Sequence, residues 1–133
     1  MSPNYFITCD GWCRGNPGPS GGSYVLATSD GRREMVRLEF GPGTNNRAEY
    51  MTIIAALEDI LGRIKRAGKD PARYTVLIQT DSRLVVGQAA EGWKIKEPGL
   101  LPLVERVRAL TAQFGEARLE WVPREEIVRV LGH

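Results

Sequence analysis

Three carboxylates stand at positions where the surrounding apolar pattern does not predict acidic residues. Asp10 ends the apolar segment 5–10, and Asp81 follows the apolar segment 74–80. Glu49 lies on the same side of a predicted helix as the apolar residues that follow it, so we expect it to face the sheet. Buried carboxylates need a counter-charge, and an all-oxygen cluster suits Mg²⁺ or Mn²⁺. The sequence therefore indicates a site for divalent cations.

Each acid also has a purely structural explanation. Asp10 precedes a glycine and could form a turn. Asp81 and Ser82 could cap the next helix, and Asn46 with Glu49 could form a capping box. Taken together these explanations weaken, because three acids at the edge of one core would repel one another unless a cation held them.

The alternation of apolar and turn residues predicts an α/β fold with a mixed sheet. Strands are expected over residues 5–10, 22–28, 33–40, 74–80 and 117–122, with a Gly/Pro-rich turn over residues 11–19. Helices are expected around residues 53–64, ending at Gly68, then after Ser82, over residues 100–114 and over residues 125–131.

The composition excludes several classes of protein. Eighteen Lys and Arg stand against 16 Asp and Glu in 133 residues, a formal net charge of +2, so any attraction to a polyanion has to be local. The sequence contains no run of about 18 apolar residues, and no basic leader segment precedes the first strand. We therefore expect a cytoplasmic protein that contacts no membrane. The length predicts one domain over residues 1–133, and Cys9 and Cys13 alone cannot complete a four-ligand zinc site.

Five motifs, in order over almost the whole chain, resemble type 1 ribonuclease H. They are Asp10-Gly11, Gly15-Asn16-Pro17-Gly18-Pro19, Thr44-Asn45-Asn46-Arg47-Ala48-Glu49-Tyr50, Thr80-Asp81-Ser82 and Trp121-Val122-Pro123-Arg124-Glu125. The resemblance implies a five-stranded mixed sheet with helices on both faces. It also implies a monomeric endonuclease without an obligate protein partner. Such an enzyme cuts the RNA strand of an RNA/DNA hybrid with two Mg²⁺ or Mn²⁺ ions, leaving 5′-phosphate and 3′-hydroxyl products.

The resemblance also assigns roles to individual residues. It makes Asp10, Glu49 and Asp81 the catalytic, metal-binding carboxylates. It assigns substrate contacts to Gly11, Trp12, Asn16, Thr44, Asn45, Arg83, Lys94 and Lys96. Arg83 stands where the family often has Gln, which favours a phosphate contact. A second basic cluster, residues 63–73, is either a phosphate-binding surface or a solvated helix face.

The C-terminal segment departs from the family pattern. The family's fourth carboxylate falls eight residues after Pro123, where this chain has Leu131. Three interpretations stay open: replacement by Glu125, Glu126 or the terminal carboxylate of His133; activity with three acids; or a hybrid-binding module that does not cleave. A nuclease with another target, such as double-stranded RNA, is a further alternative. If this segment reaches the metals, Leu131→Asp is expected to raise activity.

Overall fold

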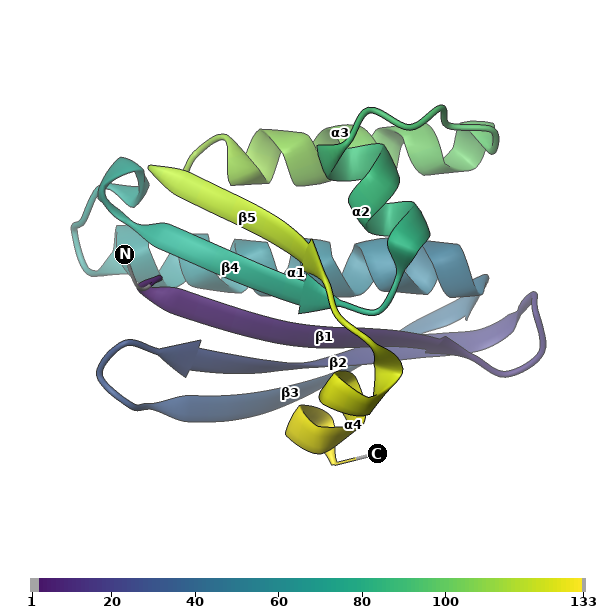
Figure 1. The fold of residues 1–133 in the computed structure, drawn as a ribbon, viewed down its shortest axis with the longest axis horizontal. Helices are drawn as coiled ribbons and strands as arrows, with labels where there is room; N and C mark the ends of the chain where they lie inside the picture. The colour runs from purple at the N-terminus through teal and green to yellow at the C-terminus, as the bar shows by residue number, and fades with distance from the viewer. Residues whose placement is uncertain (1–2, 133) are drawn as a thin grey trace.

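Five strands form one mixed sheet in the computed structural model, which describes residues 3–132 (Figure 1). The strands are β1 (Tyr5–Cys13), β2 (Gly18–Thr28), β3 (Arg33–Gly43), β4 (Thr75–Thr80) and β5 (Glu116–Trp121), in the order β3-β2-β1-β4-β5. β1, β2 and β3 pair antiparallel, whereas β4 is parallel to both β1 and β5. The mixed sheet expected from the sequence is therefore confirmed.

Helices cover both faces of this sheet. They are α1 (Asn45–Arg66), α2 (Arg83–Ala90), α3 (Leu101–Thr111) and α4 (Arg124–Leu131), with short 3₁₀ turns at Pro71–Arg73 and Pro98–Leu100. Helices α1, α2 and α3 lie behind the sheet in Figure 1, and α4 lies in front of it. No helix within residues 3–132 is both long and apolar enough to cross a membrane.

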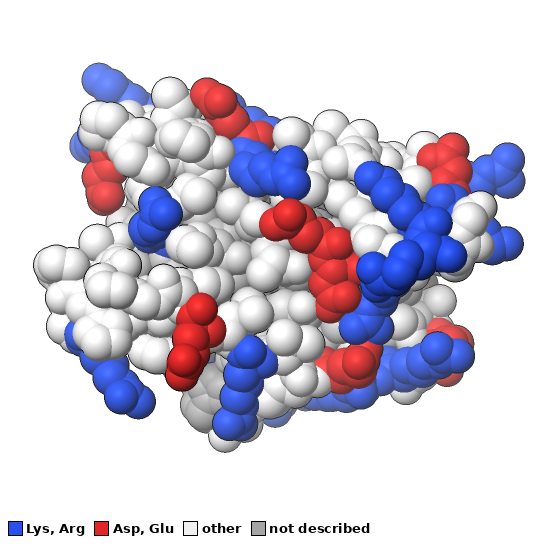
Figure 2. All heavy atoms as spheres, turned by 180° about the vertical axis from the view of Figure 1, so that it is seen from behind, with Lys and Arg blue, Asp and Glu red and all other residues white. Residues whose placement is uncertain are grey.

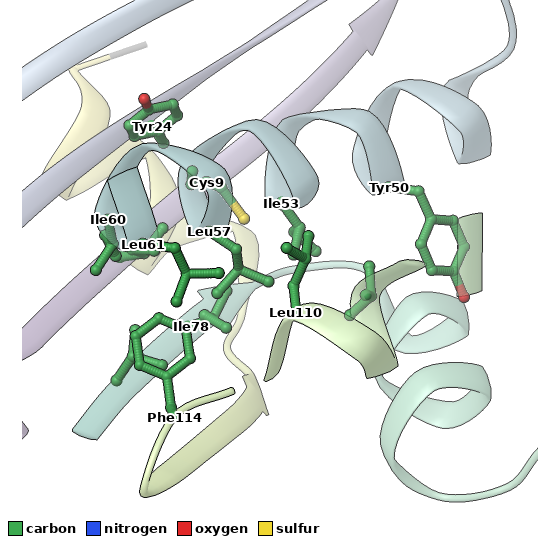
Figure 3. Close-up of a cluster of buried hydrophobic side chains, with 14 of the residues drawn as sticks. Cys9, Tyr24, Tyr50, Ile53, Leu57, Ile60, Leu61, Ile78, Leu110 and Phe114 are labelled. Carbon is green, nitrogen blue, oxygen red and sulfur yellow. The ribbon is translucent and has the colours of Figure 1, made fainter. Parts of the chain in front are cut away.

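The main core lies between the sheet and α1. Ile53, Leu57 and Ile60 are fully buried, and their three- and four-residue spacing gives α1 one continuous apolar face. Side chains from the sheet and from α3 meet this face, including Ile78 and Leu110 (Figure 3). This packing fixes where the first turns of α1 lie relative to the ends of β1 and β4.

A smaller apolar cluster holds α4 against the other face. Val25 of β2 packs with Val122, Ile127 and Leu131. The main-chain carbonyl of Val130 also accepts a hydrogen bond from the Arg33 guanidinium at 3.1 Å. These contacts hold α4 on the sheet, over β1 and β2.

Strands β1 and β2 are longer than the sequence predicted. The expected turn over residues 11–19 shrinks to residues 14–17, because the ladder continues through Gly11↔Gly22, Trp12↔Gly21 and Cys13↔Ser20. Strand pairing here overrides the low strand propensity of glycine and proline. The extension carries the main chain of residues 11–13 past the start of α1.

Thr8 offers a test of this packing. Its buried hydroxyl has no hydrogen-bond partner, and it lies in β1 opposite Val25 of the α4 cluster. Thr8→Val should raise the free energy of unfolding by about 1 kcal/mol, because it removes an unsatisfied polar group at nearly constant volume. Urea denaturation would measure the change.

A matched control is Thr52→Val, which removes a buried hydroxyl that donates to the carbonyl of Ala48 at 2.8 Å. No gain in stability is expected there. If Thr8→Val were no more stable than the parent protein, the Thr8 hydroxyl would have to be satisfied in solution.

Candidate active site

The three acids singled out in the sequence converge at one edge of the sheet. Asp10 lies in β1, Asp81 directly follows β4, and Glu49 lies near the start of α1. One carboxylate oxygen from each lies within 4.8 Å of the others. Asp10 and Glu49 are buried, and Asp81 is partly buried. Such close, poorly hydrated like charges need a cation.

Glu49 is fixed by contacts to both neighbouring strands. Its Oε1 accepts a hydrogen bond from the Gly11 main-chain N–H at 3.0 Å, and its Oε2 lies 3.5 Å from the Thr80 hydroxyl. A Cβ at position 11 would lie 2.5 Å from the Glu49 nitrogen, so only glycine permits this approach of β1 to α1. Burial, reinforced by the Asp10 and Asp81 charges, raises the pKa of Glu49 to about 8 despite these hydrogen bonds.

Other residues take the capping roles that could have explained the acids. Thr44 caps α1 by accepting from the Arg47 N–H, and Ser82 caps α2 by accepting from the Val85 N–H at 3.2 Å. Neither Asp81 nor the pair Asn46 and Glu49 is used in this way. The expected Asp81-Ser82 cap is thus made by Ser82, whereas the capping box of Asn46 and Glu49 is replaced by Thr44 and Asp10 lies within β1 rather than in a turn. The three carboxylates are left to line the site.

Arg124 is a member of the site that the sequence analysis did not single out. Its Nη1 donates to Asp10 Oδ1 at 2.8 Å and to Asp81 Oδ2 at 3.3 Å from the first residue of α4. The two carboxylates keep the pKa of Arg124 raised although burial opposes this. Its position in the Trp-Val-Pro-Arg-Glu motif is the sequence signal that could have identified Arg124 as a site residue. In this structure it supplies the counter-charge that the acids require.

The pocket around the acids has room for a ligand and is lined mostly by polar groups. Its volume is about 410 Å³, and Gly11, Trp12, Asn45, Asn46 and Ser82 line it together with the acids and Arg124. The Asn45 N–H donates to the Asn16 side-chain oxygen at 3.1 Å, which ties the 14–17 turn to the start of α1. Gly11, Trp12 and Asn45 therefore lie at the pocket, and Asn16 and Thr44 stand beside it.

The remaining predicted substrate contacts lie on two other segments. Arg83 stacks on the Trp121 ring, with its guanidinium carbon 3.7 Å from the ring centroid. Lys94 and Lys96 are exposed in the 91–97 segment between α2 and α3. The neighbouring Glu97 accepts a hydrogen bond from the Asn46 side chain at 3.3 Å, which brings this segment to the pocket side of α1.

The basic cluster of residues 63–73 lies away from the pocket. Fourteen residues of α1 separate Glu49 from Arg63, a distance of about 20 Å at the usual helical rise. Figure 2, seen from behind, shows Lys and Arg gathered towards the end of the molecule that holds the C-terminal end of α1. Arg63 is paired with Asp59 and Glu34. Of the two interpretations, the solvated helix face fits this placement.

No fourth carboxylate within residues 3–132 joins the three acids. Glu126 is half-exposed and pairs with Arg129 at 2.8 Å, and Glu125 is exposed. Leu131 is buried with Val25 and Ile127 rather than lining the pocket. The expectation that Leu131→Asp adds a metal ligand is therefore not supported, because that carboxylate would enter an apolar cluster. His133 lies outside the described residues.

Comparisons with known proteins agree with this picture. The RNase H family model matches residues 2–121. A bifunctional protein of Mycobacterium tuberculosis is 40% identical over 120 residues, which cover 89% of this chain and 31% of that protein. A ribonuclease H of a Caulobacter species is 31% identical over 121 residues, covering 91% of this chain and 77% of that protein. The chain thus spans less than a third of the length of its mycobacterial relatives.

Solved structures show the same fold. The ribonuclease H1 of Halobacterium salinarum superposes with a TM-score of 0.79 at 33% identity, covering 94% of this chain and 89% of that one. A ribonuclease H1 in complex with an RNA/DNA hybrid gives a TM-score of 0.81 at 31% identity, with the same coverage of both chains. The fold and family expected from the sequence are confirmed.

The raised pKa of Glu49 predicts how stability changes with pH when no metal is present. Between the ordinary value of 4.5 and about 8, the folded state holds a proton that the unfolded state has lost. The free energy of unfolding should therefore fall as pH rises through this range, by up to about 1.4 kcal/mol per pH unit for one proton. Glu49→Gln lacks this titration and should fall less steeply. Urea denaturation in EDTA between pH 5 and 8 would compare the two, and parallel pH profiles would refute the assignment.

A second prediction concerns Arg124 as the counter-charge. Arg124→Met should lower the free energy of unfolding in EDTA by about 1 kcal/mol, a modest loss because the side chain is half exposed. Added Mg²⁺ should reduce the deficit, since a bound cation replaces the missing charge. Arg129→Met, which breaks an exposed ion pair on the same helix, is the control. Its effect on the free energy of unfolding should be the same with and without Mg²⁺. An Mg²⁺-independent deficit in Arg124→Met would contradict this role.

Proposed function

The chain belongs to the ribonuclease H family, and we propose that it is an endonuclease that hydrolyses the RNA strand of RNA/DNA hybrids. The observation that carries this proposal is the convergence of Asp10, Glu49 and Asp81 in a pocket at the sheet edge. One structural neighbour is a ribonuclease H1 solved in complex with an RNA/DNA hybrid, which supports the choice of substrate. Products with 5′-phosphate and 3′-hydroxyl ends are part of the proposal.

The residues present fit divalent cations such as Mg²⁺ or Mn²⁺. Their donors are carboxylate oxygens, two of the three side chains are buried, and Arg124 forms ion pairs with Asp10 and Asp81. Asp10, Glu49 and Asp81 would hold the ions, which supply Lewis-acid activation of water and stabilisation of the leaving oxygen. To hold the ions, Glu49 would lose its proton and Arg124 would release Asp10 and Asp81.

Substrate positioning falls to the main chain and polar side chains around the pocket. Gly11 lines the pocket, where its main chain can contact a sugar, and the 2′-hydroxyl distinguishes RNA from DNA. Asn16, Thr44 and Asn45 are held beside the pocket, where they can hydrogen-bond the two strands. Lys94 and Lys96 offer phosphate contacts on the α1 side, and Arg83 does so beside Trp121. Arg124 lines the same pocket, so we assign it a contact with the scissile phosphate once a cation replaces it at the acids.

Cleavage of a labelled hybrid in Mg²⁺ or Mn²⁺ tests the proposal. The parent protein should cut the RNA strand, and Asp10→Asn should lower the rate by at least about 100-fold, because it removes a charged ligand that also pairs with Arg124. Arg32→Gln, an exposed change in the β2–β3 turn, serves as the control and should leave the rate unchanged.

The same assay separates the alternatives. Hybrid binding without cleavage above the Asp10→Asn background, in either metal, would leave a non-cleaving binder. Faster cleavage of double-stranded RNA than of the hybrid would reassign the substrate. Single-stranded RNA and double-stranded DNA should both be left intact.

A further inference from the structure

A second hollow opens beside the pocket, on the face of the sheet that carries α4. It has a volume of about 920 Å³ and lies over the end of β1 and the middle of β2 and β3. Trp12 and Cys13 line both this groove and the pocket that holds the acids. A strand lying in the pocket can therefore continue into the groove without crossing the core of the protein.

Trp12 provides an aromatic surface in this groove. Its ring lies directly against Gly21, where an added Cβ would come within 2.5 Å of the indole. The small residue lets the indole lie close to the backbone of β2, and Trp12 is only partly buried. The Arg14 guanidinium lies 5.4 Å from the ring centroid, which adds a cation beside the aromatic face.

The groove also carries charge that the protein itself does not neutralise. Arg14 and Arg37 are exposed, and neither forms an ion pair with a carboxylate within residues 3–132. Arg37 lies in register with Ser23 and, through it, with Asp10 of the pocket. Glu39, two residues further along β3, is the acid that lines the groove. Two unpaired cations beside an aromatic ring favour a phosphate backbone with an accessible base.

We propose that this groove binds single-stranded RNA that continues from the strand held in the pocket, with Arg14 and Arg37 contacting phosphates and Trp12 stacking on a base. The inference rests on the proposed function and extends it to hybrids whose RNA strand runs beyond the duplex. A single strand is the occupant because bases stack on side chains only when they are free of their partners. The groove would thus direct cleavage towards junctions between hybrid and single-stranded RNA.

Binding to an Asp10→Asn variant tests this without cleavage. Fluorescence anisotropy would compare a blunt hybrid with hybrids that carry a single-stranded extension on either end of the RNA strand or of the DNA strand. An RNA extension at one of its two ends should tighten binding by at least about fivefold, the effect of one stacked base. Extensions of the DNA strand should have no such effect.

Charge variants in the same background identify the groove. Arg37→Gln should abolish the gain from the RNA extension and lower the salt dependence of its binding by about 0.7 in log–log slope, the value for one contact with a single-stranded phosphate. Arg14→Gln should act in the same direction. Glu39→Gln should tighten binding of the extended hybrid, because it removes the opposing charge. Arg32→Gln, in the β2–β3 turn away from the groove, is the matched control and should change nothing.

The outcomes keep this inference separate from the proposed function. If the blunt hybrid binds but no extension strengthens binding, the groove is not a site for RNA and the inference is overturned. The same holds if the gain survives both Arg37→Gln and Arg14→Gln. If neither blunt nor extended hybrids bind, and the parent protein does not cleave, the proposed function fails and the inference falls with it.

Discussion

The hydrogen bond from the Gly11 main chain to Glu49 joins the two elements on which the site depends. It links β1 to the first turns of α1, and no side chain larger than hydrogen fits between them. The apolar face of α1 holds the helix against the sheet, so this contact is formed by packing that lies away from the acids. Glu49 is thereby placed beside Asp10 and Asp81 although burial and their charges oppose its ionisation. The folding energy of the core thus offsets the cost of assembling like charges.

The geometry also shows what neutralises those charges in the absence of metal. Arg124 reaches Asp10 and Asp81 from the opposite face of the sheet, and the small cluster around Ile127 holds α4 where this is possible. A half-exposed arginine is a reversible counter-charge, because leaving the acids costs little once another cation is present. The short α4 therefore has a direct electrostatic connection to the site even though its own acids face away from it.

Much of this arrangement could be predicted from the sequence, because the decisive patterns are local. Helical periodicity placed Glu49 on the buried side of α1, and strand ends placed Asp10 and Asp81 at one edge. Local rules failed where contacts between different segments decide the structure. The glycines and prolines in residues 11–19 predict a turn. In the structure, residues 11–13 and 18–19 belong to strands, because the β1–β2 ladder continues through this region. Arg124 was missed for the same reason, since only the fold brings it to acids more than 40 residues away in the sequence.

The groove on the α4 face shows why the net charge says so little about binding. Arg14 directly follows β1 and Arg37 lies in β3, two strands that are not adjacent in the sheet. Their shared surface exists only because β1, β2 and β3 pair in this register. A net charge of +2 sums these cations with the acids of the pocket and with the paired charges around Arg63. For a bound polyanion, the sign of the electrostatic potential along its binding surface matters more than the net charge. That surface runs from the carboxylate pocket, which suits cations, into a groove whose arginines are unpaired. An RNA strand held at the acids by metal would therefore meet attraction, not repulsion, as it leaves the pocket past Trp12.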